Sequence, residues 1–201
     1  MRRALAGLAA ALALAAPASA AAEPPVWVVR DADSEMVLFG SVHVLPPGLD
    51  WRPASLKRAL ARADDVWFEL PVTPQAEQEV AQLAASLGVL PPDKSLFAML
   101  PKAEAARLAR VAAALGADRA ALDRLEPWLA EVMLGAAAYR RAGANADDGV
   151  EKAVAAEAPP GARRRALETP AEQIGMFDRG PLNEQLASLA ETVRELDENP
   201  D

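Results

Sequence analysis

The alanine-rich stretch from residue 74 to about residue 157 constrains the fold more than any other part of the chain. Alanine has a high helix propensity, and apolar residues recur along this stretch every three or four positions. Gly88 and Gly116 each follow an apolar stripe, as glycine does where a helix ends, and Pro127 stands near the start of another stripe. The stretch therefore predicts consecutive helices whose apolar stripes are packing surfaces. The stripes cover residues 80–87, 108–115 and 125–136.

Short segments rich in β-branched and apolar residues precede the helical stretch. Residues 26–30 (VWVVR) and 36–39 (MVLF) are separated by Asp31-Ala32-Asp33-Ser34, whose side chains favour a turn, so a β-hairpin is predicted. A helical pattern at residues 53–63 then leads to another apolar run at residues 66–70. A strand, a helix and a strand in this order predict a βαβ unit, in which residues 36–39 and 66–70 run parallel with a right-handed crossover.

The C-terminal part of the chain predicts one more strand and further helix. The second half of residues 163–168 is predicted to be a strand, and Thr169 with Glu172 has the pattern of a capping box at a helix start. Helix then continues to about residue 196, with a break near Gly180-Pro181. The predicted fold class is α/β (α+β by class count): a small, mostly parallel sheet with an initial hairpin and a large helical insertion.

Residues 1–20 have the layout of a secretory signal peptide. The basic residues Arg2 and Arg3 precede a run of alanine and leucine, and Ala18-Ser19-Ala20 supplies small residues for cleavage after Ala20. The apolar run is short for a membrane span, and an uncleaved N-terminal anchor is the alternative. We expect a single domain at residues 21–201, periplasmic or secreted, with no membrane span after cleavage.

Charge and cysteine content argue against several classes of partner. The formal net charge is −8, and loss of Arg2 and Arg3 with the signal peptide makes it −10. This acidity argues against binding to nucleic acid or to an anionic membrane. The chain has no cysteine, so it folds without disulfides after export. It has no Gly-x-Ser-x-Gly elbow and no glycine-rich phosphate loop, which argues against a serine triad and against nucleotide binding.

His43 is the only histidine in the chain and follows Gly40 by three positions. Gly40 is predicted to let the backbone turn tightly after the strand, where a Cβ would obstruct it. The imidazole then lies just past a strand end, where α/β folds collect their functional groups, and its ordinary pKa suits acid–base chemistry near neutral pH. A histidine that is only hydrogen-bonded within a loop is the alternative.

Three glutamates stand at comparable positions and join His43 as candidate site residues. Glu69 and Glu168 each end a short apolar stretch, and Glu151 follows a glycine turn at a helix start. An imidazole and carboxylates at one sheet edge could bind a divalent metal or divide acid and base roles. Each glutamate also has a structural alternative. Glu69 could pair with an arginine, and Glu168 and Glu151 could stabilise helix N-termini electrostatically.

Five motifs occur in a fixed order along the chain: LFGSVHVLP (38–46), ADDVWFEL (63–70), LEPWLAEVML (125–134), GVEKAV (149–154) and ALETPAEQIGMFD (166–178). Together they resemble the TraB/GumN/PrgY family, which is related to the Tiki metalloproteases, from about residue 26 to the C-terminus. The resemblance implies an exported protein with an α/β core, a helical insertion and a metal-dependent hydrolase or protease activity on peptide or protein substrates.

By this resemblance His43, Glu69 and Glu168 are the implied metal ligands and catalytic residues, with Gly40 and Glu151 in support. The implied cofactor is a divalent metal (Mn, Co, Zn or Ca). One histidine with carboxylates suits zinc poorly and manganese or calcium better. Family members carry a second Gly-x-x-His motif in a further C-terminal portion, which this chain is expected to lack. Two functions stay open: an exported metal-dependent hydrolase, or a non-catalytic domain of the same fold that binds a partner through its helical region.

Overall fold

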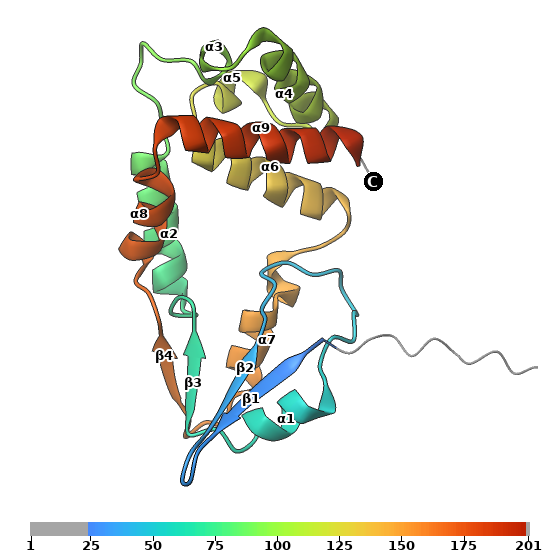
Figure 1. Ribbon diagram of the computed structural model, residues 1–201, viewed down its shortest axis with the longest axis vertical. Coiled ribbons are helices and arrows are strands. Elements are labelled where there is room, and N and C mark those ends of the chain that lie inside the picture. The colour runs from blue at the N-terminus through green and yellow to red at the C-terminus, as the bar shows by residue number, and fades with distance from the viewer. Residues whose placement is uncertain (1–23, 200–201) are drawn as a thin grey trace, which may run out of the picture.

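The computed structural model describes residues 24–199. Helices predominate in this range, and short strands form two separate pairs, so the predicted mixed α/β class is confirmed (Figure 1). The predicted signal peptide at residues 1–20 lies outside the described residues. Among the helices of residues 24–199, none is long and apolar enough to span a bilayer.

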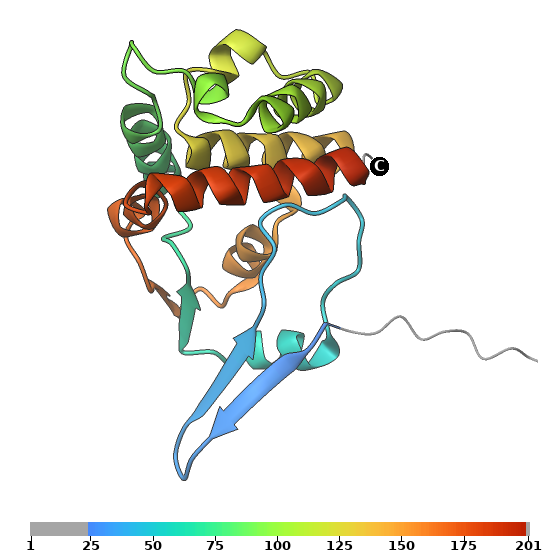
Figure 2. The same cartoon turned by 45° about the horizontal axis from the view of Figure 1, so that its top comes forward.

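The predicted hairpin is present. Strands β1 (Val26–Arg30) and β2 (Glu35–Phe39) pair in antiparallel register. Asp31 closes the turn, because its Oδ1 atom accepts hydrogen bonds from both the amide and the hydroxyl of Ser34 at 2.8 Å. Asp at the start of a turn commonly bonds the backbone in this way. The hairpin projects from the rest of the molecule, as Figure 2 shows.

Strand β3 (Asp65–Phe68) pairs in parallel with β4 (Arg163–Ala166) and not with β2. The predicted parallel arrangement of residues 36–39 with residues 66–70 in one sheet is therefore wrong. Asp65 gives a physical reason, because it accepts hydrogen bonds from Nε of Arg163 at 2.8 Å and from Nε of Arg165 at 2.6 Å. These guanidinium groups hold the pKa of Asp65 well below its usual range. Charge-assisted contacts of this kind favour β4 as the neighbour of β3.

The helical insertion lies between β3 and β4, as predicted. Thr73 caps the start of its first helix, because its hydroxyl accepts a hydrogen bond from the amide of Ala76 at 3.2 Å. Gly88 caps the end of the same helix. The insertion contains the helices α2 (Pro74–Leu87), α3 (Leu96–Met99), α4 (Lys102–Ala114), α5 (Arg119–Leu122), α6 (Pro127–Arg141) and α7 (Val150–Glu157) and the 3₁₀ turn η1 (Ala146–Asp148). The sequence analysis did not predict α3, α5 and η1 as separate elements.

The main hydrophobic core lies among the helices. The predicted capping box of Thr169 and Glu172 begins α8 (Pro170–Asp178), and α9 (Leu182–Glu198) follows the predicted break. Helix α9 runs alongside α6 and contacts α4 (Figures 1 and 2). The side chains at its centre are fully buried, which identifies this three-helix contact as the principal source of hydrophobic stabilisation. They are Leu108 of α4, Leu134 of α6, and Leu189 and Val193 of α9.

A second, smaller core positions the loops that carry the candidate site. It joins α1 (Ala54–Leu60), β3 and α7 through Leu60, Val66, Phe68 and Ala158. Apolar burial on both sides of this contact sets α7 against β3. The end of β3 and the start of α7 also come close to each other, since the amide of Glu69 lies 3.5 Å from Oε1 of Glu151.

Candidate functional site

The loop that follows β2 carries His43 and is held against the loop that precedes α7. The amide of Val150 donates a hydrogen bond to the carbonyl oxygen of Val42 at 2.9 Å. Leu45 and Asn145 exchange two backbone hydrogen bonds, at 3.2 and 3.0 Å. Hydrogen bonds on both sides of His43 fix its backbone, and the imidazole lies beside the first turn of α7.

Gly149 allows this close approach of the two loops. A Cβ atom at position 149 would lie only 2.3 Å from the carbonyl oxygen of His43. The requirement comes from contact and not from backbone conformation, because the φ angle of −59° at Gly149 suits any residue. At Gly40, by contrast, an added Cβ would meet no described atom within 4 Å. The predicted steric role of Gly40 is therefore wrong, and Gly149 has that role instead.

Two glutamates flank the imidazole of His43, one at each ring nitrogen. Nδ1 lies 3.2 Å from Oε2 of Glu151, and Nε2 lies 3.5 Å from Oε2 of Glu69. Glu151 stands in the first turn of α7 and Glu69 directly follows β3, so the second hydrophobic core positions both. The structure thus brings together three of the residues that the sequence proposed.

Gln173 is a site residue that the sequence analysis missed. Its Nε2 atom donates a hydrogen bond to Oε1 of Glu69 at 2.6 Å, from a half-buried position near the start of α8. This contact holds Oε1 of Glu69, and the other carboxylate oxygen, Oε2, faces His43. The motif at residues 166–178 contains Gln173, and a polar side chain in the first turn of the helix that follows a strand is the signal that could have identified it.

Glu168 reaches the site through its backbone alone. Its amide donates a hydrogen bond to the carbonyl oxygen of Glu69 at 3.0 Å. Its Oε2 atom is buried and has no hydrogen-bond partner within residues 24–199, and in that range its carboxylate forms no ion pair with His43. The structure therefore does not bring the carboxylate of Glu168 to the imidazole.

The described residues do not assemble a full set of metal ligands. Within residues 24–199 no three or more His, Cys, Asp or Glu side chains are grouped so that they could hold an ion. Nε2 of His43 and Oε2 of Glu69, 3.5 Å apart, offer two ligand atoms, whereas protein metal sites commonly supply three or more. The divalent metal implied by the resemblance therefore does not fit these residues alone.

The site opens into a pocket of about 460 Å³, whose walls include His43, Glu69, Glu151 and Gln173. At the rim, Lys152 pairs with Glu77 and with Asp147, each at 3.2 Å. A cavity of this size is in the range of small-molecule and peptide side-chain sites. The pocket gives a substrate access to the imidazole.

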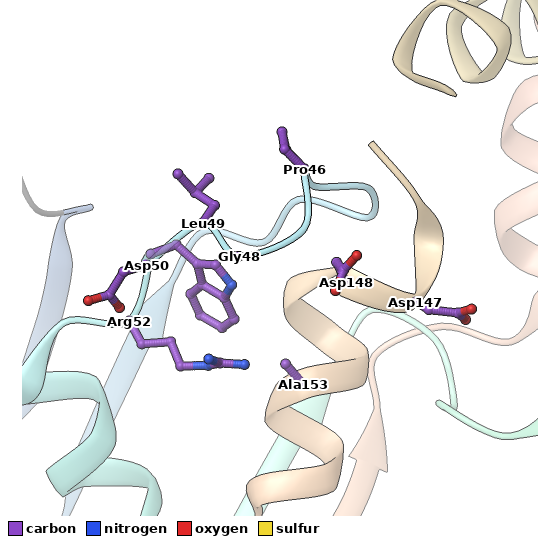
Figure 3. A pocket seen from close by; sticks show the side chains of 9 residues that line it. Pro46, Gly48, Leu49, Asp50, Arg52, Asp147, Asp148 and Ala153 are labelled. Atoms are coloured by element: carbon purple, nitrogen blue, oxygen red, sulfur yellow. The ribbon is translucent and has the colours of Figure 1, made fainter. Parts of the chain in front are cut away.

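A second pocket, of about 360 Å³, lies between the loop at residues 46–52 and α7. Figure 3 shows Arg52 extending across it toward Ala153. Nε of Arg52 lies 3.1 Å from Oε1 of Glu157, and its guanidinium group packs over the ring of Trp51, 4.8 Å from the centroid. These contacts join the loop to α7, and none of the sequence-predicted site residues lines this pocket.

The two carboxylates change the protonation of the site. The hydrogen bond to Glu151 raises the pKa of His43 above its ordinary 6.5, partial burial opposes this, and the charge of Glu69 adds to the rise. The same hydrogen bond lowers the pKa of Glu151 from its ordinary 4.5. The contribution of His43 to folding stability is complete below pH 6.5 and is lost as the pH rises through its raised pKa. The contribution of Glu151 is present above pH 4.5 and is lost as the pH falls through its lowered pKa. The pair therefore stabilises the fold most between these two values, by a small amount because the His43 side chain is 66% exposed.

We predict that an NMR titration of the single imidazole gives a pKa for His43 above 6.5, and that Glu151→Gln lowers it. The lower value follows because a neutral amide no longer stabilises the imidazolium. Glu157→Gln, at the other end of α7, is the matched control and should leave this pKa unchanged. Equal pKa values in the chain and in its Glu151→Gln variant would contradict the observed contact.

Gly149→Ala is expected to displace the main chain of His43, because the new Cβ cannot remain 2.3 Å from a carbonyl oxygen. The NMR signals of the imidazole should shift, and the pKa of His43 should fall toward 6.5 as its contact with Glu151 is lost. Gly135→Ala in α6 is the control, since an added Cβ there meets no described atom within 4 Å. That change should leave the imidazole signals in place and raise stability by up to about 1 kcal/mol through helix propensity. Unchanged imidazole signals in Gly149→Ala would show that the loops need no close approach.

Comparison with known proteins gives one result. A family model described as the TraB/PrgY/gumN family matches residues 25–201. The match includes the loop of His43, the end of β3 and the start of α7. Searches of curated proteins and of solved structures gave no match.

Proposed function

Since this chain belongs to the TraB/PrgY/gumN family, we propose that it is an exported hydrolase of peptide bonds in which His43 is the catalytic base. The observation that supports this proposal is the position of the only histidine, with a carboxylate at each ring nitrogen and a pocket beside it. A histidine held only for structural reasons would not need two carboxylates and an open pocket. These contacts therefore favour a catalytic His43 over a histidine that is only hydrogen-bonded within a loop.

The proposed mechanism uses the two faces of the imidazole separately. The carboxylate of Glu151 accepts a hydrogen bond from Nδ1, which fixes the neutral tautomer with its free lone pair on Nε2. Nε2 removes a proton from a water molecule as that water attacks the peptide carbonyl carbon. The imidazolium then donates the proton to the leaving amine. The carboxylate of Glu69, held by Gln173, stabilises the imidazolium between the two steps.

The proposed export rests on the signal-peptide pattern of residues 1–20. Expression in a Gram-negative host is expected to release a periplasmic product whose N-terminus is Ala21. N-terminal sequencing of the product tests both the compartment and the cleavage position. An intact N-terminus in the membrane fraction would support an uncleaved anchor instead.

The hydrolase proposal is tested with a fluorogenic peptide library and the purified chain, with and without EDTA and with added Mn²⁺. We expect hydrolysis whose rate rises with pH through the raised pKa of His43, because only neutral imidazole accepts a proton. Glu69→Gln should slow the reaction more than Glu168→Gln, since only the carboxylate of Glu69 lies near Nε2. A strict requirement for Mn²⁺ would contradict the base role of His43 and would instead make His43 and Glu69 metal ligands.

A non-catalytic partner-binding domain is the second candidate, and one observation favours it. On α6, Val132, Met133 and Tyr139 are about half exposed, although the predicted stripe made the first two packing residues. Exposed large apolar side chains on one helix are typical of docking surfaces. This candidate predicts no hydrolysis in the library assay, so the same experiment separates the two functions.

A further inference from the structure

The pocket beside His43 has an apolar wall that the proposed hydrolysis does not use. Val72, Ala76 and Val80 recur at intervals of four residues at the start of α2 and just before it, so they share one side of the chain there. Leu70 and Pro71 continue the wall to Glu69. Ala76 is 6% exposed and the others are half-buried, so the wall is a fixed surface and not a flexible rim.

Ala76 has the smallest side chain of this wall. Helix α2 packs against α8, which carries Gln173, so the wall and the carboxylate of Glu69 have a common support. A substrate side chain that lies on the wall is therefore placed at a defined distance from the imidazole. Such positioning is how a remote contact contributes to the rate of a reaction.

The charges in the same pocket are mostly negative. Glu69, Glu77 and Glu151 line it, and the single lysine of the lining, Lys152, is already paired with Glu77 and with Asp147. An acidic side chain would meet like charges and an apolar wall without hydrogen-bond donors. An aliphatic side chain would bury apolar area at no such cost.

We propose that Val72, Ala76 and Val80 form a specificity subsite, which accepts an aliphatic substrate side chain of the size of valine or leucine and rejects an acidic one. This inference rests on the proposed hydrolase function, because the subsite would select the substrate of that reaction. It concerns binding, however, so peptide affinity tests it separately from hydrolysis. Ala76 sets the depth of the subsite, and Val80 sets its outer limit.

The test titrates acetyl-Gly-Leu-Gly-amide, acetyl-Gly-Asp-Gly-amide and acetyl-Gly-Gly-Gly-amide into the full chain and follows the NMR signals of the His43 imidazole. We expect the leucine peptide to bind at least about tenfold more tightly than the other two, as the burial of one aliphatic side chain implies. The same samples are then assayed for hydrolysis. Leucine-selective binding without hydrolysis would support the subsite and contradict the hydrolase proposal. Hydrolysis without side-chain preference would support the hydrolase proposal and contradict the subsite.

Variants locate the binding on the wall. Ala76→Leu fills the subsite and should weaken the leucine peptide at least tenfold while the glycine peptide is unaffected. Ala85→Leu, at an exposed position of the same helix, is the matched control and should change neither. Val80→Phe narrows the subsite from a half-buried position, so it gives the same result if Ala76→Leu does not fold. Equal binding of the leucine and aspartate peptides, no binding of any peptide at millimolar concentration, or unchanged selectivity in Val80→Phe would overturn the proposal.

Discussion

His43→Ala is expected to lower the rate of peptide hydrolysis by about 10²–10⁴-fold, which is the usual contribution of a positioned acid–base group. The fold should survive, because the His43 side chain is 66% exposed and belongs to neither hydrophobic core. The measurement is kcat/KM on the best peptide of the library, together with a urea unfolding curve. A rate loss at unchanged stability would assign the effect to chemistry.

Glu151→Gln is the companion variant, because it removes the charge at Nδ1 but keeps a side chain of the same shape. Its rate should fall less than that of His43→Ala, since the imidazole remains and only its tautomer and basicity change. Elemental analysis of the chain and of its His43→Ala and Glu69→Ala variants adds an independent test of the implied divalent metal. About one metal per chain, lost in His43→Ala and in Glu69→Ala, would make these side chains ligands. An unchanged rate in His43→Ala would contradict the role of His43 as the catalytic base.

The helical part of the fold could be predicted from the sequence because its signals are local. Helix propensity, apolar spacing and caps act within a few residues, as at Thr73, at Gly88 and in the capping box of Thr169 with Glu172. The partner of β3 could not be predicted, because Asp65 meets Arg163 and Arg165 about a hundred residues further along the chain. The sequence Arg163-Arg164-Arg165 is equally compatible with a solvated surface and with two ion pairs to one aspartate, so it did not identify the partner strand.

The candidate site was predictable in part for the same reason. Position at a strand end or a helix start identified His43, Glu69 and Glu151, but it could not show which side each residue faces. The paired register ends at Phe68 and Ala166, and beyond it the amide of Glu168 bonds the carbonyl oxygen of Glu69 while its carboxylate forms no contact with His43. The backbone conformation after the two strand ends decides this orientation, and the sequence pattern does not encode it. The roles of Gly149 and Gln173 depend on contacts between distant segments.

Leu189→Ala is expected to give the largest loss of stability, about 2–5 kcal/mol in the free energy of unfolding. Leu189 is 0% exposed and lies in α9 at the contact with α4 and α6, within the same cluster as Leu108 and Leu134. Truncation removes buried methyl groups and leaves a cavity that these rigid helices fill only partly. Urea unfolding followed by circular dichroism measures the change.

Leu182→Ala is the matched control, since it makes the same substitution on the same helix at a side chain that is 48% exposed. Its effect should stay within about 0.5 kcal/mol, as for most surface substitutions. The imidazole signals of His43 should be the same in both variants under native conditions, because α9 contributes no residue to the pocket. Equal losses of stability in the two variants would mean that α9 does not anchor the helical core. A shift of the imidazole signals in Leu189→Ala alone would mean that packing at α9 is transmitted through α8 to Gln173 and Glu69.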